Sequence, residues 1–182
     1  METPWVTGIP QELGGSGDPS PYTAHGVLMG MKAAAKEKLG TDSLKGVKVA
    51  VQGLGNVGSH LVKYLTEEGA QIVVSDIDLD RVKKCHDQYG VEVVTPDRIL
   101  SVECDIQAPC ALGAIVNDQT ITQFKCKIIA GGANNQLAEA KHGDQLRELG
   151  ILYAPDYVLN AGGLMNVFVE LDTFCLAVFM VD

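Results

Sequence analysis

Short apolar runs alternate along the chain with longer stretches in which apolar side chains recur every three or four residues. The short runs have strand length and are rich in Val and Ile, which predicts β-strands. They cover residues 47–52, 71–75, 91–94, 104–107, 127–130 and 151–153. The longer stretches predict helices at 20–39, 59–68, 80–89, 141–148 and 161–171, with shorter helical segments at 98–100 and 118–123.

This alternation predicts an α/β fold in which a doubly wound, mostly parallel sheet carries helices on both faces. Residues 1–21 are rich in Gly and Pro and are expected to be extended, ahead of a single domain over residues 22–182. Ser20 is expected to cap the first helix, with Pro21 as its first helical residue and Gly40 just after its end.

One strand–turn–helix–strand unit carries a recognisable motif. The strand at 47–52 leads into Gly53-Leu54-Gly55-Asn56-Val57-Gly58, which is G-x-G-x-x-G, and a helix follows. In this context the motif predicts a Rossmann-type dinucleotide site, because each glycine has a mechanical role there. Gly53 permits the tight turn, Gly55 lets the backbone approach a pyrophosphate, and Gly58 lets the helix pack on the sheet. A glycine-rich surface turn is the simpler alternative.

Asp76 ends the second strand of this unit, 18 residues after Gly58. An acid near this spacing holds the hydroxyl groups of the adenosine ribose. A ribose 2′-phosphate about 4 Å from that carboxylate would be repelled by roughly 4 kcal/mol at an effective dielectric constant of 20. The sequence therefore predicts NAD rather than NADP, unless Arg81 turns back towards the phosphate.

Ligands of doubly wound folds lie at the carboxyl ends of the strands. Besides the glycine-rich turn, that edge is expected to carry the turns at 108–110, 131–135 and 160–163. Their Gly and Asn content fits either a binding role or ordinary turn chemistry. The residues alone leave both interpretations open for these three turns.

The composition of the chain limits the classes of partner and site that are expected. The net charge of −9 makes nucleic acid and anionic membrane surfaces unlikely partners. No apolar run reaches the length of a membrane span, and no secretory signal pattern begins the sequence. Five cysteines without a C-x-x-C pair fit free thiols in a reducing cytoplasm, and Cys110 is more simply a small buried residue than a nucleophile. The four histidines lack metal-ligand spacing, so no metal site is expected.

An ordered series of motifs runs through almost the whole chain. It comprises Gly17-Asp18-Pro19-Ser20-Pro21 with Thr23-Ala24, Met31-Lys32-Ala33-Ala34, Val51-Gln52-Gly53-Leu54-Gly55-Asn56-Val57, Ala108-Pro109-Cys110-Ala111-Leu112-Gly113, Ala130-Gly131-Gly132-Ala133-Asn134-Asn135-Gln136-Leu137, His142-Gly143, Tyr153-Ala154-Pro155-Asp156-Tyr157 and Asn160-Ala161-Gly162-Gly163. Over residues 3 to 170 this series resembles the Glu/Leu/Phe/Val dehydrogenases, and their leucine branch most closely.

The resemblance implies oxidative deamination of an L-amino acid to a 2-oxo acid and ammonia, with reduction of NAD. It also implies roles for individual positions. The glycine-rich turn would hold the pyrophosphate and Asp76 with Ile77 the adenosine ribose. The nicotinamide half would lie along Ala108, Pro109, Cys110 and Asn134, with Asn160 and Thr23 at its carboxamide. Thr7, Asn135 and Val167 match positions that face the substrate.

Family members are two-domain oligomers, and nothing in this sequence matches their segments with the catalytic lysines and the essential aspartate. The chain is therefore expected to be a C-terminal cofactor domain that binds NAD without turning over an amino acid, and to self-associate. Residues 172–182 depart from the family pattern and are largely apolar. The alternatives are a non-catalytic NAD-binding module, a subunit of a split enzyme, and an oxidoreductase of other chemistry related to malic enzymes.

Overall fold

The structure is a computed structural model that describes residues 9–10, 12 and 15–168. Its sheet has six strands in the order β3-β2-β1-β4-β5-β6, and every pair of neighbours is parallel. The strands are β1 (Lys48–Gln52), β2 (Gln71–Ser75), β3 (Glu92–Val93), β4 (Ile106–Pro109), β5 (Ile128–Ile129) and β6 (Leu152–Tyr153). This is the doubly wound Rossmann order, so the predicted fold class is confirmed.

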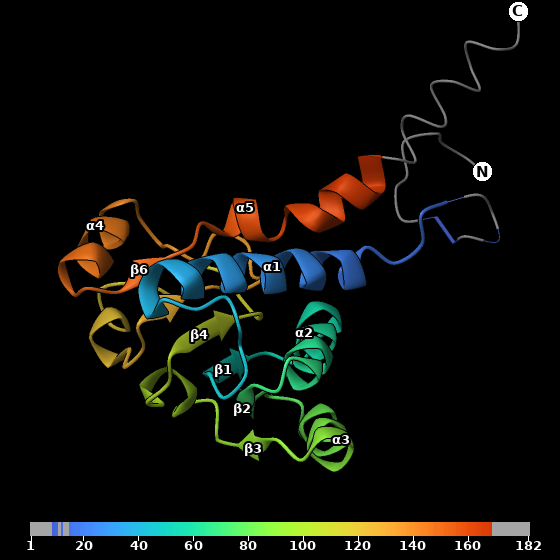
Figure 1. Cartoon of the computed structure of the whole chain (residues 1–182), viewed down its shortest axis with the longest axis horizontal. Helices are drawn as coiled ribbons and strands as arrows, with labels where there is room; N and C mark the ends of the chain where they lie inside the picture. The colour runs from blue at the N-terminus through green and yellow to red at the C-terminus, as the bar shows by residue number, and fades with distance from the viewer. Residues whose placement is uncertain (1–8, 11, 13–14, 169–182) are drawn as a thin grey trace, which may run out of the picture.

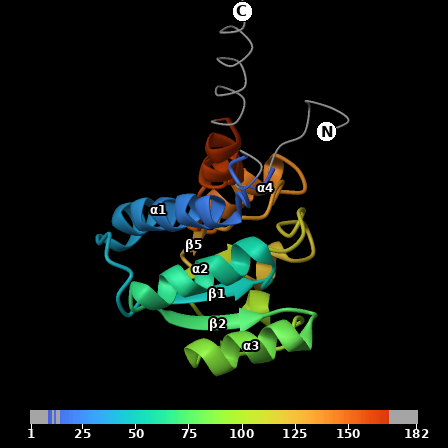
Figure 2. The ribbon, with the colours of Figure 1, turned by 90° about the vertical axis from the view of Figure 1, so that its right-hand side faces the viewer.

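Helices cover both faces of the sheet. The α-helices are α1 (Ser20–Leu39), α2 (Asn56–Glu67), α3 (Leu79–Tyr89), α4 (Lys141–Glu148) and α5 (Asp156–Leu159), with helical residues continuing at 161–168 and short 3₁₀ helices η2 (Ile99–Ser101) and η3 (Ile121–Gln123). Figure 1 shows α2 and α3 on the same side of the strands. Figure 2 looks onto this face and shows α1, α2 and α3 one below another.

Alternate strand residues enter two separate cores. Val49 and Val51 of β1 pack with apolar residues of α1, α2 and α3, whereas Ala50 faces η2, η3 and α4 on the other side. Likewise Ile128 of β5 enters the first core and Ile129 the second. Burial on both faces explains why the strands are continuous apolar runs rather than alternating ones.

The start of α1 differs from the prediction. Ser20 is the first helical residue rather than the cap, and the cap position is Pro19, with no side-chain hydrogen bond to the helix. The backbone N–H and the hydroxyl of Ser20 both donate to Oδ1 of Asp18, at 2.9 and 2.6 Å. The Ser20 hydroxyl therefore acts as a donor, and these two bonds lower the pKa of Asp18. Gly40 ends the helix with a left-handed backbone, as predicted.

Other boundaries differ by a few residues. Helix α2 begins at Asn56 inside the glycine-rich turn, with Gly55 as its cap residue. Strand β4 begins at Ile106, because Glu103 only forms an isolated bridge with Lys125 before the chain bends. The predicted helix at 161–171 is helical over 161–168, and its last residues lie outside the described part of the chain.

Asp105 ties three strands together at the amino-terminal edge of the sheet. Its Oδ2 accepts from the backbone N–H of Lys48 at the start of β1, at 3.1 Å. Its Oδ1 lies 2.8 Å from the ammonium of Lys127, which precedes β5. The hydrogen bond from Lys127 lowers the pKa of Asp105, followed by the backbone bond from Lys48.

We expect Asp105→Asn to lower the free energy of unfolding by about 1 kcal/mol at pH 7. Because the pKa of Asp105 is lower in the folded state, its stabilisation is present above the unfolded pKa near 4 and is lost as the pH falls through the folded value. Urea unfolding at pH 7 and pH 3 should therefore show that the difference in free energy of unfolding between Asp105→Asn and the native protein is smaller at pH 3. Asp144→Asn, which removes an exposed pair with Arg147, should change little at either pH. If Asp105→Asn lowered the free energy of unfolding equally at both pH values, this account would be contradicted.

Candidate functional site

The candidate site lies where β1 and β4 end side by side. From β1 the chain continues to β2 and β3 on one side, and it then returns to β4, β5 and β6 on the other, so the winding direction reverses between β1 and β4. The backbone N–H of Cys110, just after β4, donates to the carbonyl oxygen of Gln52 at the end of β1, at 2.7 Å. In doubly wound folds the crevice outside this reversal point is the usual ligand site.

Two of the three glycines in the glycine-rich turn, Gly53 and Gly58, leave no room for a side chain. Gly53 has φ +97°, a left-handed backbone that favours glycine, and its N–H donates to the carbonyl oxygen of Ser75 at 2.8 Å. A Cβ atom on Gly58 would lie 2.0 Å from the carbonyl oxygen of Gly53. A Cβ atom on Gly55 would have only the guanidinium of Arg81 within 4 Å, at 3.9 Å. The turn is therefore closed towards the sheet and open above Gly55.

Asp76 holds this turn from the end of β2. Its Oδ2 accepts from the backbone N–H of Leu54 at 2.5 Å, and its Oδ1 accepts from the N–H of Asp78 at 2.8 Å. Ile77 is 88% exposed beside it. Arg81 pairs through its Nε with Asp78 at 3.1 Å, and its Nη1 lies near Gly55.

The turns after β4 and β5 are joined through their backbones. The N–H of Ala133 donates to the carbonyl oxygen of Pro109 at 2.9 Å. A Cβ atom on Gly131 would lie 2.2 Å from that same oxygen, so the second turn can lie against the first only with glycine at this position. Ala108 is fully buried within β4, whereas Asn134 is exposed in the turn after β5.

Two asparagines bridge the turn after β5 to the end of α5. The Nδ2 of Asn160 donates to the Oδ1 of Asn134 at 2.6 Å. Asn135 has φ +51°, and its carbonyl oxygen accepts from the N–H of Ala114 at 2.6 Å. The sequence-predicted residues Asn134, Asn135 and Asn160 thus stand together, with side chains that can donate and accept hydrogen bonds.

Gln136, at the end of the turn after β5, has a structural role that the sequence did not predict. Its side chain is fully buried, and its Nε2 donates to the carbonyl oxygens of Gly131 at 2.8 Å and Ala133 at 3.0 Å. It therefore fixes the turn that presents Asn134. A polar residue directly after a Gly- and Asn-rich turn was the available signal.

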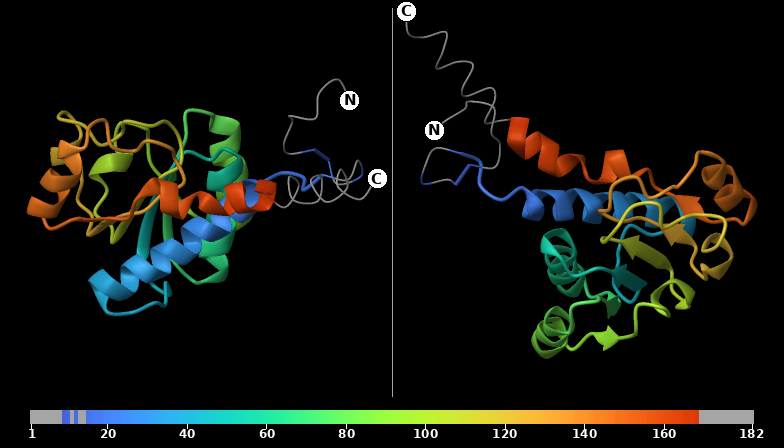
Figure 3. Two further views of the ribbon diagram at one scale, coloured as in Figure 1. Left: turned by 90° about the horizontal axis from the view of Figure 1, so that it is seen from above. Right: turned by 180° about the vertical axis from the view of Figure 1, so that it is seen from behind.

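Thr23 lies on α1, next to the turn at 160–163. Its hydroxyl donates to the carbonyl oxygen of Pro19 at 3.0 Å, and a Cβ atom on Gly163 would lie 2.3 Å from its Oγ1. Figure 3 shows the 156–168 segment running along α1. Val167 is half-buried in that segment, whereas Thr7 lies outside the described residues.

One cluster of potential metal ligands exists among the described residues. Ligand atoms of Asp118, Glu139 and His142 lie within 4.8 Å of one another. The ammonium of Lys141 already pairs with Asp118 at 3.1 Å and with Glu139 at 3.0 Å. Because the ammonium of Lys141 bridges both carboxylates and His142 hydrogen-bonds to Asp118, this cluster is explained as an ion-pair network.

Burial makes the described thiols poor nucleophiles. It raises the pKa of Cys110 to about 11, and it is likewise the main reason that the pKa values of Cys104 and Cys126 are raised to about 11 and about 12. At neutral pH these thiols stay protonated, and the thiolate is the reactive form. This supports the interpretation of Cys110 as a small packing residue.

We expect Cys110 to react slowly with a disulfide reagent at pH 7 in the folded protein, because so little of it is thiolate. The measurement is peptide mapping after timed labelling of a Cys175→Ser variant, since Cys175 lies outside the described residues. The same variant unfolded in guanidinium is the control and should label quickly at every cysteine. Rapid labelling of Cys110 in the folded protein would contradict its assignment as an inert packing residue.

The family model for Glutamate/Leucine/Phenylalanine/Valine dehydrogenase matches residues 14–79 and 75–174. The chain belongs to this family. Among curated relatives, leucine dehydrogenase of Geobacillus stearothermophilus is 59% identical over 171 residues, which cover 94% of this chain and 47% of that protein. The chain thus spans about half the length of the curated relatives it matches.

Solved structures agree with the fold. L-tryptophan dehydrogenase from Nostoc punctiforme superposes with a TM-score of 0.82 at 49% identity, over 84% of this chain and 46% of that one. The Leu-bound form of hetero-hexameric glutamate dehydrogenase from Thermus thermophilus gives 0.73 at 26% identity, over 91% of this chain and 42% of that one. Within the described part of the chain, no helix is long and apolar enough to cross a bilayer.

Proposed function

We propose that this chain is the NAD-binding, C-terminal domain of an NAD-dependent amino acid dehydrogenase, with leucine or another branched-chain amino acid as the substrate. The observation that carries the proposal is the arrangement around the β1/β4 crevice. The glycine-rich turn and Asp76 lie on one side, and the hydrogen-bonded pair Asn134 and Asn160 follows β5 and α5 on the other.

The glycine-rich turn suits a pyrophosphate. Above Gly55 the backbone is open, and the first turn of α2 provides N–H groups that have no partner within the helix. The helix dipole adds positive potential at the same end. Asp76, already oriented by two backbone N–H groups, would accept from the ribose hydroxyls with its remaining lone pairs.

The amide pair suits the nicotinamide half. Asn160 and Asn134 supply side-chain donors and acceptors of the kind that a carboxamide needs. Gln136 holds the turn that carries Asn134 through its hydrogen bond to the carbonyl oxygen of Gly131. When bound, NAD supplies the acceptor for a substrate hydride. The residues of this chain would then bind the cofactor, orient its nicotinamide ring and shield it from water. The four turns contain no Lys, His, Asp or Glu that could act as a base.

The choice of leucine rests on the 59% identity to leucine dehydrogenase, while a tryptophan dehydrogenase and a glutamate dehydrogenase share the fold. Thr7, Asn135 and Val167 remain the proposed substrate-facing positions. We further propose a homo-oligomer in the cytoplasm. The glutamate dehydrogenase of Thermus thermophilus is named as a hetero-hexamer, which supports oligomerisation. No nucleic acid or membrane partner is proposed.

A second candidate is an NAD-binding module that works with a separate catalytic chain. The composition of the four turns favours it, because general acid–base chemistry would have to come from elsewhere.

The role of Asp76 can be tested with Asp76→Asn, which keeps an acceptor for the N–H of Leu54 but removes the charge. We expect the native chain to bind NAD more tightly than NADP, and the variant to lose about tenfold of that preference, because repulsion of a 2′-phosphate disappears. Calorimetric titration with both cofactors measures the ratio. Asp80→Asn, which changes an exposed carboxylate at the start of α3, is the control. An unchanged ratio in Asp76→Asn would contradict the assignment of Asp76.

Residues 1–182 expressed alone are expected to bind NAD but to produce no NADH with leucine, valine or isoleucine. The physical reason is that hydride transfer needs a base and a near-attack geometry that the four turns do not provide. Absorbance at the NADH band measures turnover, with a full-length leucine dehydrogenase as the positive control. Sustained NADH production by the purified chain would contradict the expectation, while absence of NAD binding would refute the proposed function itself.

A further inference from the structure

Two cysteines lie opposite one another where the chain approaches β4 and β5. Cys104 precedes β4, and Cys126 precedes β5. The two approaching segments form a parallel bridge just before the cysteines, and they pair as strands from Ile106 and Ile128 onwards. Both pairings join residues 22 positions apart in the sequence. Cys104 and Cys126 have the same spacing, so they are partners across the two segments.

The backbones of these segments are close enough for a disulfide. The N–H of Cys104 donates to the carbonyl oxygen of Lys125 at 3.4 Å, and the N–H of Lys127 donates to that of Asp105 at 3.1 Å. Paired strands lie about 4.8 Å apart, within the Cα separation of about 4.4 to 6.8 Å that a disulfide spans. Neither cysteine belongs to a regular strand, so both segments can adjust to the geometry of an S–S bond.

The two side chains enter the same core. Cys104 and Cys126 are free, half-buried and packed against the apolar cluster on the η2, η3 and α4 side of the sheet, whereas Cys85 and Cys110 belong to the cluster on the other side. The Sγ of Cys104 lies 3.9 Å from the Oε1 of Gln107, to which it donates. Burial is the main cause that raises the pKa of Cys126, and the neighbouring Cys104 raises it further. The pair is therefore separated from the other described thiols.

We propose that Cys104 and Cys126 are a modification site at which a peroxide forms a disulfide between the approaches to β4 and β5. The thiolate of one cysteine attacks a peroxide oxygen and the O–O bond breaks, which leaves a sulfenic acid. The departing hydroxide takes up the proton that the thiol gave up and becomes water. The second cysteine then loses its proton and attacks the sulfenic sulfur, so that the S–S bond forms, the S–O bond breaks and a second water leaves. Two thiols thereby lose two electrons, and one peroxide gains them.

The bond would close a loop over residues 104–126, which contains β4, the turn after it and η3. A closed loop restricts the unfolded chain and so stabilises the folded one. The bond would lie at the amino-terminal edge of the sheet, whereas the candidate cofactor site lies at the carboxyl ends of the strands. This inference therefore does not depend on the proposed function. Since both thiols stay protonated at neutral pH, the reaction is slow and the reduced pair gains no stability from a thiolate.

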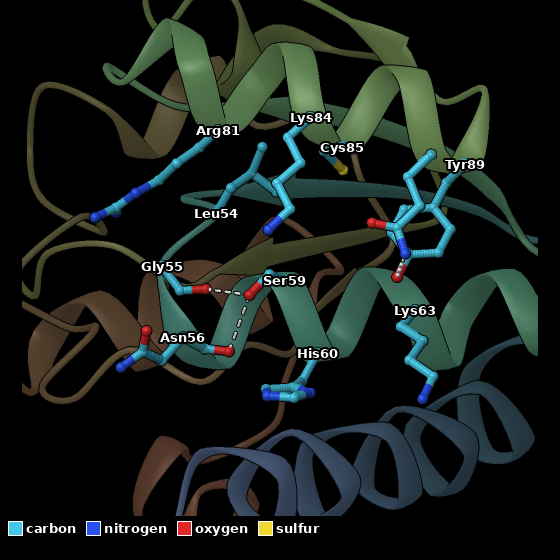
Figure 4. A pocket seen from close by; sticks show the side chains of 11 residues that line it. Leu54, Gly55, Asn56, Ser59, His60, Lys63, Arg81, Lys84, Cys85 and Tyr89 are labelled. Carbon is cyan, nitrogen blue, oxygen red and sulfur yellow. Dashed lines mark hydrogen bonds between the residues drawn. The ribbon is translucent and has the colours of Figure 1, made fainter. Parts of the chain in front are cut away.

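The test exposes the Cys175→Ser chain to hydrogen peroxide, alkylates the remaining thiols and maps the peptides by mass spectrometry without reduction. The variants are Cys126→Ala and Cys104→Ala, each of which leaves one cysteine of the pair alone. The matched control is Cys85→Ala, because Cys85 lies on α3 beside α2 (Figure 4), in the core on the other face of the sheet. Far-ultraviolet circular dichroism shows whether each variant is folded, independently of NAD.

We expect a linked pair of peptides that contains Cys104 and Cys126 and has lost two hydrogen atoms. The same link should form in Cys85→Ala and be absent from both variants of the pair, in which the remaining cysteine stops at sulfenic acid and reacts with a 1,3-diketone probe. Urea unfolding of the oxidised chain should give a folding equilibrium constant about a hundredfold higher than that of the reduced chain. Treatment with a dithiol reductant should reverse this gain.

Oxidation of either cysteine to sulfinic acid without a link between them would overturn the inference. So would peptides that link Cys104 or Cys126 to Cys85 or Cys110 instead, or a link that leaves the unfolding in urea unchanged.

Discussion

The structure depends on the contact between the end of β1 and the first turn of α2, where two backbone segments meet with no side chain between them. Gly58 lies so close to the carbonyl oxygen of Gly53 that a single added carbon would clash at 2.0 Å. Gly53 itself needs a left-handed backbone. This contact lets α2 start directly at the sheet edge, and it aims the free N–H groups of its first turn into the β1/β4 crevice.

Similar contacts build the rest of the edge. Gly131 brings the turn after β5 against Pro109, and Gly162 and Gly163 bring the 160–163 turn against α1, where a Cβ on Gly162 would lie 2.3 Å from the carbonyl oxygen of Tyr22. Hydrogen bonds to the backbone then fix two of these turns: Asp76 holds the glycine-rich turn and Gln136 holds the 131–135 turn. The edge is therefore a rigid frame of glycine contacts, and the polar groups that it exposes are the asparagines and the carboxylate of Asp76.

Apolar runs and glycine positions were sufficient to predict the strands, the main helices and the glycine-rich turn, because burial on both sheet faces and left-handed turns constrain residue type strongly. The role of Ser20 was predicted wrongly, since whether a hydroxyl accepts or donates depends on Asp18 nearby. The clamp formed by Gln136 and the pairing of Arg81 with Asp78 were not predicted either. Both partners are near in the sequence, but which neighbouring group a side chain turns towards is not contained in the pattern of residue types.

The most direct test of the central claim is a crystal structure of the chain with NAD bound. The account predicts the pyrophosphate above Gly55 at the first turn of α2, the adenosine ribose on Asp76, and the carboxamide beside Asn134 and Asn160. A dinucleotide bound elsewhere, or a diphosphate that makes no contact with the glycine-rich turn, would contradict it.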